Sequence, residues 1–118
     1  MQLQLSPRLL DGVLVLDCSG RMVSGEELFF FKNFMQELLA GTKAVVLNLE
    51  AVSYMDSGGL SVVIGAYTSA RTRGGHLKLA RVNPAIRDLL RITKLLGVIE
   101  VHDTVEDAVG DVRKAAVA

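Results

Sequence analysis

The sequence contains few of the residues on which disulfides and metal sites depend. Its 118 residues include one cysteine, two histidines and no tryptophan. Because Cys18 is alone, an intrachain disulfide is excluded, and the count fits a reducing, cytoplasmic setting. Two histidines and one cysteine without ligand spacing do not favour a metal site, and we expect no cofactor.

An excess of one charge is also missing. Thirteen Lys and Arg residues balance thirteen Asp and Glu residues. A nucleic-acid-binding protein normally carries a basic excess, so direct binding to nucleic acid is not expected. With 50% hydrophobic and 22% charged residues, the composition is that of a globular domain rather than a disordered chain.

Long apolar runs do not occur either. Stretches such as Val13 to Leu16 and Val45 to Leu47 are far shorter than the ~18 residues of a membrane span. The first five residues lack the basic head and the apolar run of a signal peptide. We therefore expect no membrane insertion, and a single domain over residues 1–118.

What is present is an alternation of strand and helix patterns. A hairpin is expected first, with strands over 2–6 and 13–18 joined at Asp11-Gly12, and with Gly20 ending the second strand. Helices and strands then alternate, with strands predicted over 44–49, 76–82 and 98–102 and helices starting near Ser24, Ser57, Asn83 and Thr104. This order predicts an α/β fold, namely a mixed, mostly parallel sheet with an N-terminal antiparallel hairpin and about four helices.

Local signals predict how the helices begin and end. Ser24 followed by Glu27 fits a capping box, and Gly41 is expected as the C′ residue of the same helix. The third helix is expected to open with Asn83 as N-cap and Pro84 at its first position. A loop is predicted over 50–56, before the second helix.

All four phenylalanines lie in the first predicted helix. At about 100° per residue they cannot all face one core, so Phe29 and Phe30 are expected to point outward. They either pack under a neighbouring loop or form an apolar patch, which would serve a homodimer or another partner.

In a mostly parallel sheet, functional groups gather where strands end and helices begin. Here these places are residues 20–24, 53–59, 82–84 and 102–104. The sequence has no phosphate loop, dinucleotide turn or nucleophile elbow. Because no base is evident beside the neighbouring Asp56 and Ser57, no catalytic residue is expected. His76 and His102 fall on predicted strands, where packed or surface roles are favoured over catalysis.

Residues 50–60 contain the most informative segment, Met-Asp-Ser-Gly-Gly-Leu. One interpretation is structural: Asp56 or Ser57 caps a helix, and the two glycines let the chain turn closely. A second interpretation is functional, because a serine in the first turn of a helix is exposed and the glycines leave its backbone accessible to another protein. A phosphate on Ser57 would add about −1.5 to −2 charges. Asp56 would repel them, and a partner covering the site would have to desolvate them.

Four segments are similar to a known family: Val45 to Leu49, Ser53 to Leu60, Gly74-Gly75 before a strand, and Asn83-Pro84 opening a helix. The sequence resembles the STAS domain family over nearly its whole length. Within that family it is most similar to the bacterial anti-sigma factor antagonists. The resemblance implies that the unphosphorylated protein binds an anti-sigma factor, which is also a serine kinase, and thereby releases a sigma factor.

The resemblance further implies that phosphorylation of Ser57 ejects the antagonist and that a serine phosphatase restores it. The protein would then be a substrate and a binding module without enzymatic activity. Asp56 would orient the motif and repel the phosphate. We expect the surface that binds the partner to include Arg21, Met22, Asp56, Gly58 and Gly59. For Arg21 the alternative is a solvated surface charge that contacts no partner.

Two residues depart from the family pattern. Gly58 stands where many members have a second Ser or Thr, so Ser57 is the only hydroxyl at that point of the motif. Val23 stands where an acidic residue is common, which predicts an altered partner or weaker phosphorylation.

Two other functions are also considered. A STAS subunit of a transport or signalling assembly, such as a lipid-transport ABC complex, would dock permanently through the same surface without modification of Ser57. An enzyme or small-ligand binder would require a concave pocket with converging polar groups beside Ser57.

Overall fold

The computed structural model of the protein describes residues 3–117. They form one five-stranded sheet in the order β1-β2-β3-β4-β5 and four helices. The elements are β1 (Gln4–Leu10), β2 (Val13–Met22), α1 (Glu26–Gly41), β3 (Ala44–Met55), α2 (Ser57–Thr72), β4 (His76–Ala80), α3 (Pro84–Ile92), β5 (Val101–His102) and α4 (Val105–Val117). β1 and β2 are antiparallel and the other neighbours are parallel, so the predicted fold is confirmed.

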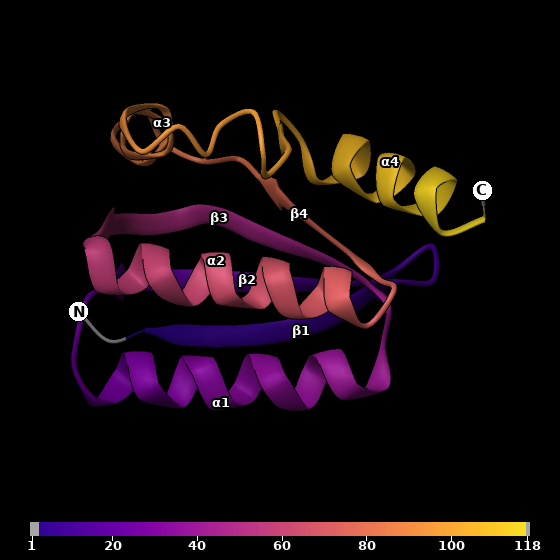
Figure 1. Cartoon of the computed structure of the whole chain (residues 1–118), viewed down its shortest axis with the longest axis horizontal. Coiled ribbons are helices and arrows are strands. Elements are labelled where there is room, and N and C mark those ends of the chain that lie inside the picture. Colours follow the sequence, from indigo (N-terminus) through magenta and orange to yellow (C-terminus); the bar gives the residue numbers. More distant parts are fainter. Residues whose placement is uncertain (1–2, 118) are drawn as a thin grey trace.

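The helices cover the two faces of the sheet unequally. Figure 1 shows α1 and α2 side by side on one face and α4 on the other, with α3 above the ends of the strands. The larger core lies under α1 and α2 and includes Phe31, Leu47 and Val63. The smaller core lies under α4 and includes Val15, Val46 and Val109. No helix among residues 3–117 is long and apolar enough to cross a bilayer.

β2 and β3 are longer than predicted. β2 passes through Gly20, which has a φ of 104°, and β3 continues through the segment predicted as a loop. The register of the β2–β3 pair shifts between Asp17 and Ser19 and again between Gly20 and Arg21. Each shift adds one residue to β3 relative to β2. Such bulges bend the strand that contains them without ending it. Both strands therefore reach the same end of the sheet, directly before α2.

The predicted ends of α1 are wrong. Its N-cap is Gly25, without a side-chain cap, and Ser24 and Glu27 do not form a capping box. Glu27 instead accepts a hydrogen bond of 2.7 Å from the backbone N–H of Leu3. α1 includes Gly41, and the next residue is extended, so Gly41 is not a left-handed C′ residue.

Other local predictions are confirmed. Asn83 caps α3, because its side-chain oxygen accepts a 2.8 Å hydrogen bond from the N–H of Ile86. Phe29 and Phe30 point outward, with 67% and 59% of their surface exposed.

Two strands are shorter than predicted: β4 ends at Ala80, and β5 has only two residues.

Candidate functional site

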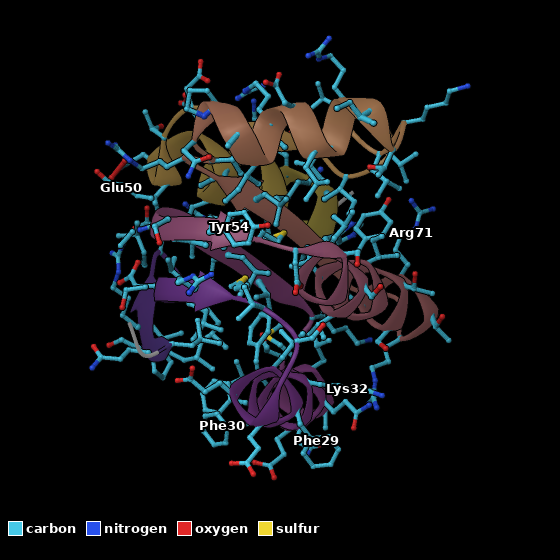
Figure 2. All side chains as sticks on the ribbon, turned by 90° about the vertical axis from the view of Figure 1, so that its left-hand side faces the viewer. Phe29, Phe30, Lys32, Glu50, Tyr54 and Arg71 are labelled. Atoms are coloured by element: carbon cyan, nitrogen blue, oxygen red, sulfur yellow. The ribbon has the colours of Figure 1, made fainter. Side chains whose placement is uncertain are left out.

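The candidate site lies where β3 passes into α2, at the end of the sheet that faces the viewer in Figure 2. Met55, the last residue of β3, is buried, and Ser57, the first residue of α2, is exposed. The backbone N–H of Asp56 between them donates a 3.1 Å hydrogen bond to the carbonyl of Met22 at the end of β2. The exposed serine thus stands on a turn that is fixed to the neighbouring strand.

The carboxylate of Asp56 joins two segments that are distant in sequence. Its Oδ1 accepts a 2.9 Å hydrogen bond from the N–H of Gly59, which caps α2. Its Oδ2 accepts a 3.0 Å hydrogen bond from the N–H of Ser24, in the loop between β2 and α1. The hydrogen bonds from the backbones of Ser24 and Gly59 lower the pKa of Asp56. Asp56 is therefore an ionised residue that orients the turn, with one backbone N–H bonded to each of its oxygens.

Ser57 occupies the first turn of a 16-residue helix. The first backbone N–H groups of a helix have no partner within the helix, and the helix dipole makes this end positive. The carbonyl of Ser57 accepts a 2.9 Å hydrogen bond from the hydroxyl of Ser61, one turn further along α2. An anionic group on Ser57 would meet favourable amides on one side and the Asp56 carboxylate on the other.

The two glycines of the motif serve contacts within the protein. A Cβ atom on Gly58 would overlap the hydroxyl oxygen of Ser24, so this hydroxyl fills the space where a side chain at Gly58 would begin. A Cβ atom on Gly59 would overlap the carbonyl oxygen of Met22, because α2 and the end of β2 are in direct contact. The absence of side chains thus lets β2, its following loop and α2 pack together.

Two of the residues predicted to contact a partner are not accessible. Met22 has no exposed surface, and Gly59 is buried, so the prediction of direct contact is wrong for both. They shape the site from beneath. Arg21, by contrast, is exposed, and its guanidinium carbon lies 5.5 Å from the centroid of the Tyr54 ring. Gly58 is half-buried.

The contact between Ser24 and Gly58 predicts that these two residues are energetically coupled. Gly58→Ala alone should lower the free energy of unfolding by about 1 kcal/mol, because the new methyl group displaces the Ser24 hydroxyl. In a Ser24→Ala background the same change should be neutral or stabilising, since alanine is favoured over glycine in a helix by about 1 kcal/mol. Urea unfolding of the four proteins of this cycle measures the coupling, and additive effects would contradict the contact.

Sequence reasoning missed the role of Ser24, which it assigned to a cap of α1. The bond from Ser24 to Asp56 spans 32 positions in the sequence, and no local pattern indicates it. It also missed a groove between the end of β3 and α3, with a volume of about 260 Å³. This groove is mostly apolar and is lined by Tyr54, Met55, Ala85, Ile86, Asp88, Leu89 and Ile92.

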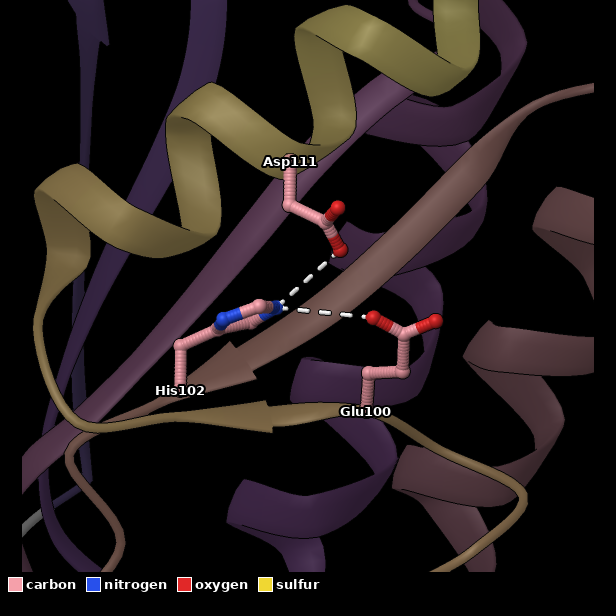
Figure 3. A group of neighbouring side chains, drawn as sticks. All are labelled: Glu100, His102 and Asp111. Atoms are coloured by element: carbon pink, nitrogen blue, oxygen red, sulfur yellow. Dashed lines mark ion pairs between the residues drawn. The ribbon is translucent and has the colours of Figure 1, made fainter.

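A second cluster of titratable residues lies on β4, on β5 and the residue before it, and on α4. One side-chain ligand atom from each of Glu100, His102 and Asp111 falls within 4.8 Å of the others (Figure 3). The ammonium of Lys78 already lies between the two carboxylates, 2.9 Å from Glu100 and 3.0 Å from Asp111. Interactions with the Glu100 carboxyl group and with the Lys78 ammonium lower the pKa of Asp111 to about 2. The cluster is an ion-pair network that fastens α4 to the sheet.

Comparison with known proteins adds the family context. The sequence profile of the family described as "STAS domain" matches residues 4–108. The chain is 29% identical over 105 residues to the anti-sigma F factor antagonist of Paenibacillus polymyxa, covering 87% of this chain and 89% of that protein.

Solved structures agree with the fold. The crystal structure of an anti-sigma factor antagonist from Mycobacterium paratuberculosis matches with a TM-score of 0.83 at 23% identity, covering 95% of both chains. The Bacillus cell fate determinant SpoIIAA in its phosphorylated form matches with a TM-score of 0.72 at 20% identity, covering 94% of this chain and 99% of that chain. The family profile spans all five strands and the first three helices described above, and the chain belongs to the STAS domain family.

Proposed function

We propose that this protein is an anti-sigma factor antagonist whose binding surface is switched off by phosphorylation of Ser57. The unphosphorylated form binds an anti-sigma factor that is also a serine kinase, and the sigma factor is released. The kinase then transfers the γ-phosphoryl group of ATP to the Ser57 hydroxyl, ADP leaves, and the hydroxyl proton is released. A serine phosphatase hydrolyses the phosphoester and restores the binding form.

The observation that carries this proposal is the exposed Ser57 on a turn held by Asp56. A hydroxyl at the first turn of α2 is accessible to a kinase, and the fixed turn presents it in one orientation. The relative named above supports the choice of partner class, since it is an anti-sigma F factor antagonist. The structural relative SpoIIAA exists in a phosphorylated form, which supports a phosphorylated state of this protein.

The electrostatics of the turn explain why a phosphate would disrupt binding. A double charge about 5 Å from a single like charge costs roughly 1.5 to 6 kcal/mol between water-like and surface-like dielectrics. In the free protein the phosphate can rotate into water. A partner packed over the turn removes that option and must also desolvate the phosphate. A net loss of about 4 kcal/mol corresponds to about a thousandfold in affinity.

The experiment is phosphorylation by the serine kinases of the anti-sigma factor class from the same organism. Each kinase is incubated with this protein and ATP, and the product is mapped by mass spectrometry. The proposal predicts one phosphate on Ser57, none on Ser57→Ala, and an unchanged amount on Ser61→Ala, which removes a neighbouring exposed hydroxyl of α2. A failure of every kinase to modify Ser57 would contradict the proposal.

A homodimer through Phe29 and Phe30 stays a prediction. Figure 2 shows the two rings on different sides of α1, so they do not form one flat patch. The Phe30 ring lies 6.0 Å from that of Phe34, on the same helix, whereas Phe29 has a larger exposed fraction than Phe30.

A further inference from the structure

The groove between the end of β3 and α3 exposes large apolar side chains next to the candidate site. Tyr54 is 50% exposed and Ile92 is 74% exposed, and both line the groove. Tyr54 is two residues before Asp56, and Figure 2 shows it near the centre of the end of the molecule that carries the site. One wall of the groove, Tyr54 and Met55, therefore directly precedes the turn that bears Ser57.

Packing within the protein does not account for this exposure. Met55 points into the core from β3, and Ile86 and Leu90 point into it from α3. Tyr54 and Ile92 lie on the outer sides of the same two elements. Exposed apolar groups that gather beside a functional site are typical of a protein–protein contact, whereas single scattered ones need no explanation.

Arg21 gives this surface a charge. Three arginines at the same end of the sheet form ion pairs within the chain: Arg81 with Glu50, Arg87 with Asp103 and Arg91 with Asp88. Arg21 has no ion pair within residues 3–117, and its guanidinium lies over the exposed ring of Tyr54. It is a cation held in place by an aromatic ring, with its charge left for an external group.

The acid nearest in sequence to this surface, Asp56, keeps its charge but forms no ion pair with Arg21 among residues 3–117. The Asp56 carboxylate is occupied by the backbone N–H groups of Ser24 and Gly59. Val23, two residues after Arg21, is an apolar side chain. The surface therefore combines exposed apolar side chains with the guanidinium of Arg21, while its own carboxylate, Asp88, is already paired with Arg91.

We propose that the groove formed by Tyr54, Leu89 and Ile92 is the second half of the partner-binding surface. It takes an apolar side chain of the partner protein, next to a partner carboxylate that pairs with Arg21. The inference rests on the proposed function, because the partner that covers Ser57 is the protein that fills the groove. It deepens that function by stating the chemistry that selects the partner, namely an aliphatic side chain beside an acidic one.

The first test compares two variants that place the same acid on an exposed aliphatic position. Ile92→Glu puts it in the groove, and Leu9→Glu puts it on β1, where Leu9 is 75% exposed. We expect Ile92→Glu to weaken binding to the kinase that modifies Ser57 by about tenfold or more, as for a central apolar anchor. Leu9→Glu should stay within about twofold of the wild type, as for a residue outside an interface.

Arg21 is tested by charge reversal. Arg21→Glu should weaken the same complex by about tenfold, and Arg21→Lys, which keeps the charge, should weaken it less. Equal affinities of Ile92→Glu, Arg21→Glu and the wild type would overturn the inference. Urea unfolding of each variant separates a binding defect from a folding defect.

A second measurement does not depend on the kinase. Capped Leu-Glu and Leu-Lys dipeptides are titrated at millimolar concentration into the ¹⁵N-labelled protein and followed by NMR. The inference predicts shifts at Tyr54, Leu89 and Ile92 with Leu-Glu, and weaker ones with Leu-Lys or with the Arg21→Glu variant. Equal shifts with both peptides, or shifts only elsewhere, would overturn it. If no kinase binds, the proposed function fails and the peptides alone decide the inference.

Discussion

Ser57→Asp should bind the kinase partner about thirtyfold more weakly than the wild-type protein, a loss of about 2 kcal/mol. The expected loss follows from one added negative charge beside the Asp56 carboxylate, which costs roughly 0.8 to 3 kcal/mol at about 5 Å. Because Asp56 is fixed by hydrogen bonds to Ser24 and Gly59, it cannot turn away to relieve the repulsion. Isothermal titration calorimetry with the purified kinase measures the difference.

Ser57→Asn is the matched control for this charge. Asparagine has nearly the shape of aspartate and is also accepted at the start of a helix, but it adds no charge. It should therefore bind within about threefold of the wild type, since only a polar contact at the surface is altered. Equal losses for Ser57→Asp and Ser57→Asn would show that shape rather than charge controls the contact, and would contradict the electrostatic explanation.

Gly59→Ala should lower the free energy of unfolding by about 3 kcal/mol, at the upper end of the usual cost of overpacking. The new Cβ atom would overlap the carbonyl oxygen of Met22 and lie 2.9 Å from its Cβ atom. That carbonyl accepts the 3.1 Å hydrogen bond from the N–H of Asp56, so the backbone of β2 cannot retreat without breaking a contact of the site. Urea unfolding followed by circular dichroism measures the change.

Gly65→Ala on the same helix provides the comparison. Gly65 is exposed, and a Cβ atom there would have no atom within 4 Å. This change should stabilise the protein by about 0.5 to 1 kcal/mol, because alanine is a better helix former than glycine. If Gly59→Ala were as stable as Gly65→Ala, the close contact between α2 and β2 would be contradicted.

The order of elements was predictable because each element has its own period of apolar residues. Leu28, Phe31, Met35 and Leu39 recur at helical spacing, and all four are buried on α1. The exposure of Ser57 was predictable for a related reason, since it directly follows a strand and opens a helix. The apolar pattern of the sequence and the observed burial agree wherever a residue is buried or exposed because of its position within its own helix or strand.

The long end of β3 could not be predicted in the same way. Val52 and Met55 are buried, but they are three residues apart, which is not the spacing of a regular strand. The bulges in the β2–β3 pairing produce this spacing, and they depend on which residues of β2 lie opposite. A pattern read along one segment contains no information about the register of its neighbour.

The geometry of the site was only partly predictable for the same reason. The sequence indicated that Asp56 and two glycines shape a turn before a helix. It did not indicate that the carboxylate holds Ser24, or that Gly59 is required by the carbonyl of Met22. Met22 ends β2 and Ser24 lies in the loop that follows it, more than thirty residues earlier in the chain, and only the folded sheet brings them to the motif.

The most direct test of the central claim is the affinity of the kinase partner for two forms of the wild-type protein. One form carries a stoichiometric phosphate on Ser57, verified by mass spectrometry, and the other is the same sample after treatment with a serine phosphatase. We predict that the phosphorylated form binds about a thousandfold more weakly and that phosphatase treatment restores the original affinity. Equal affinities of the two forms would contradict the account.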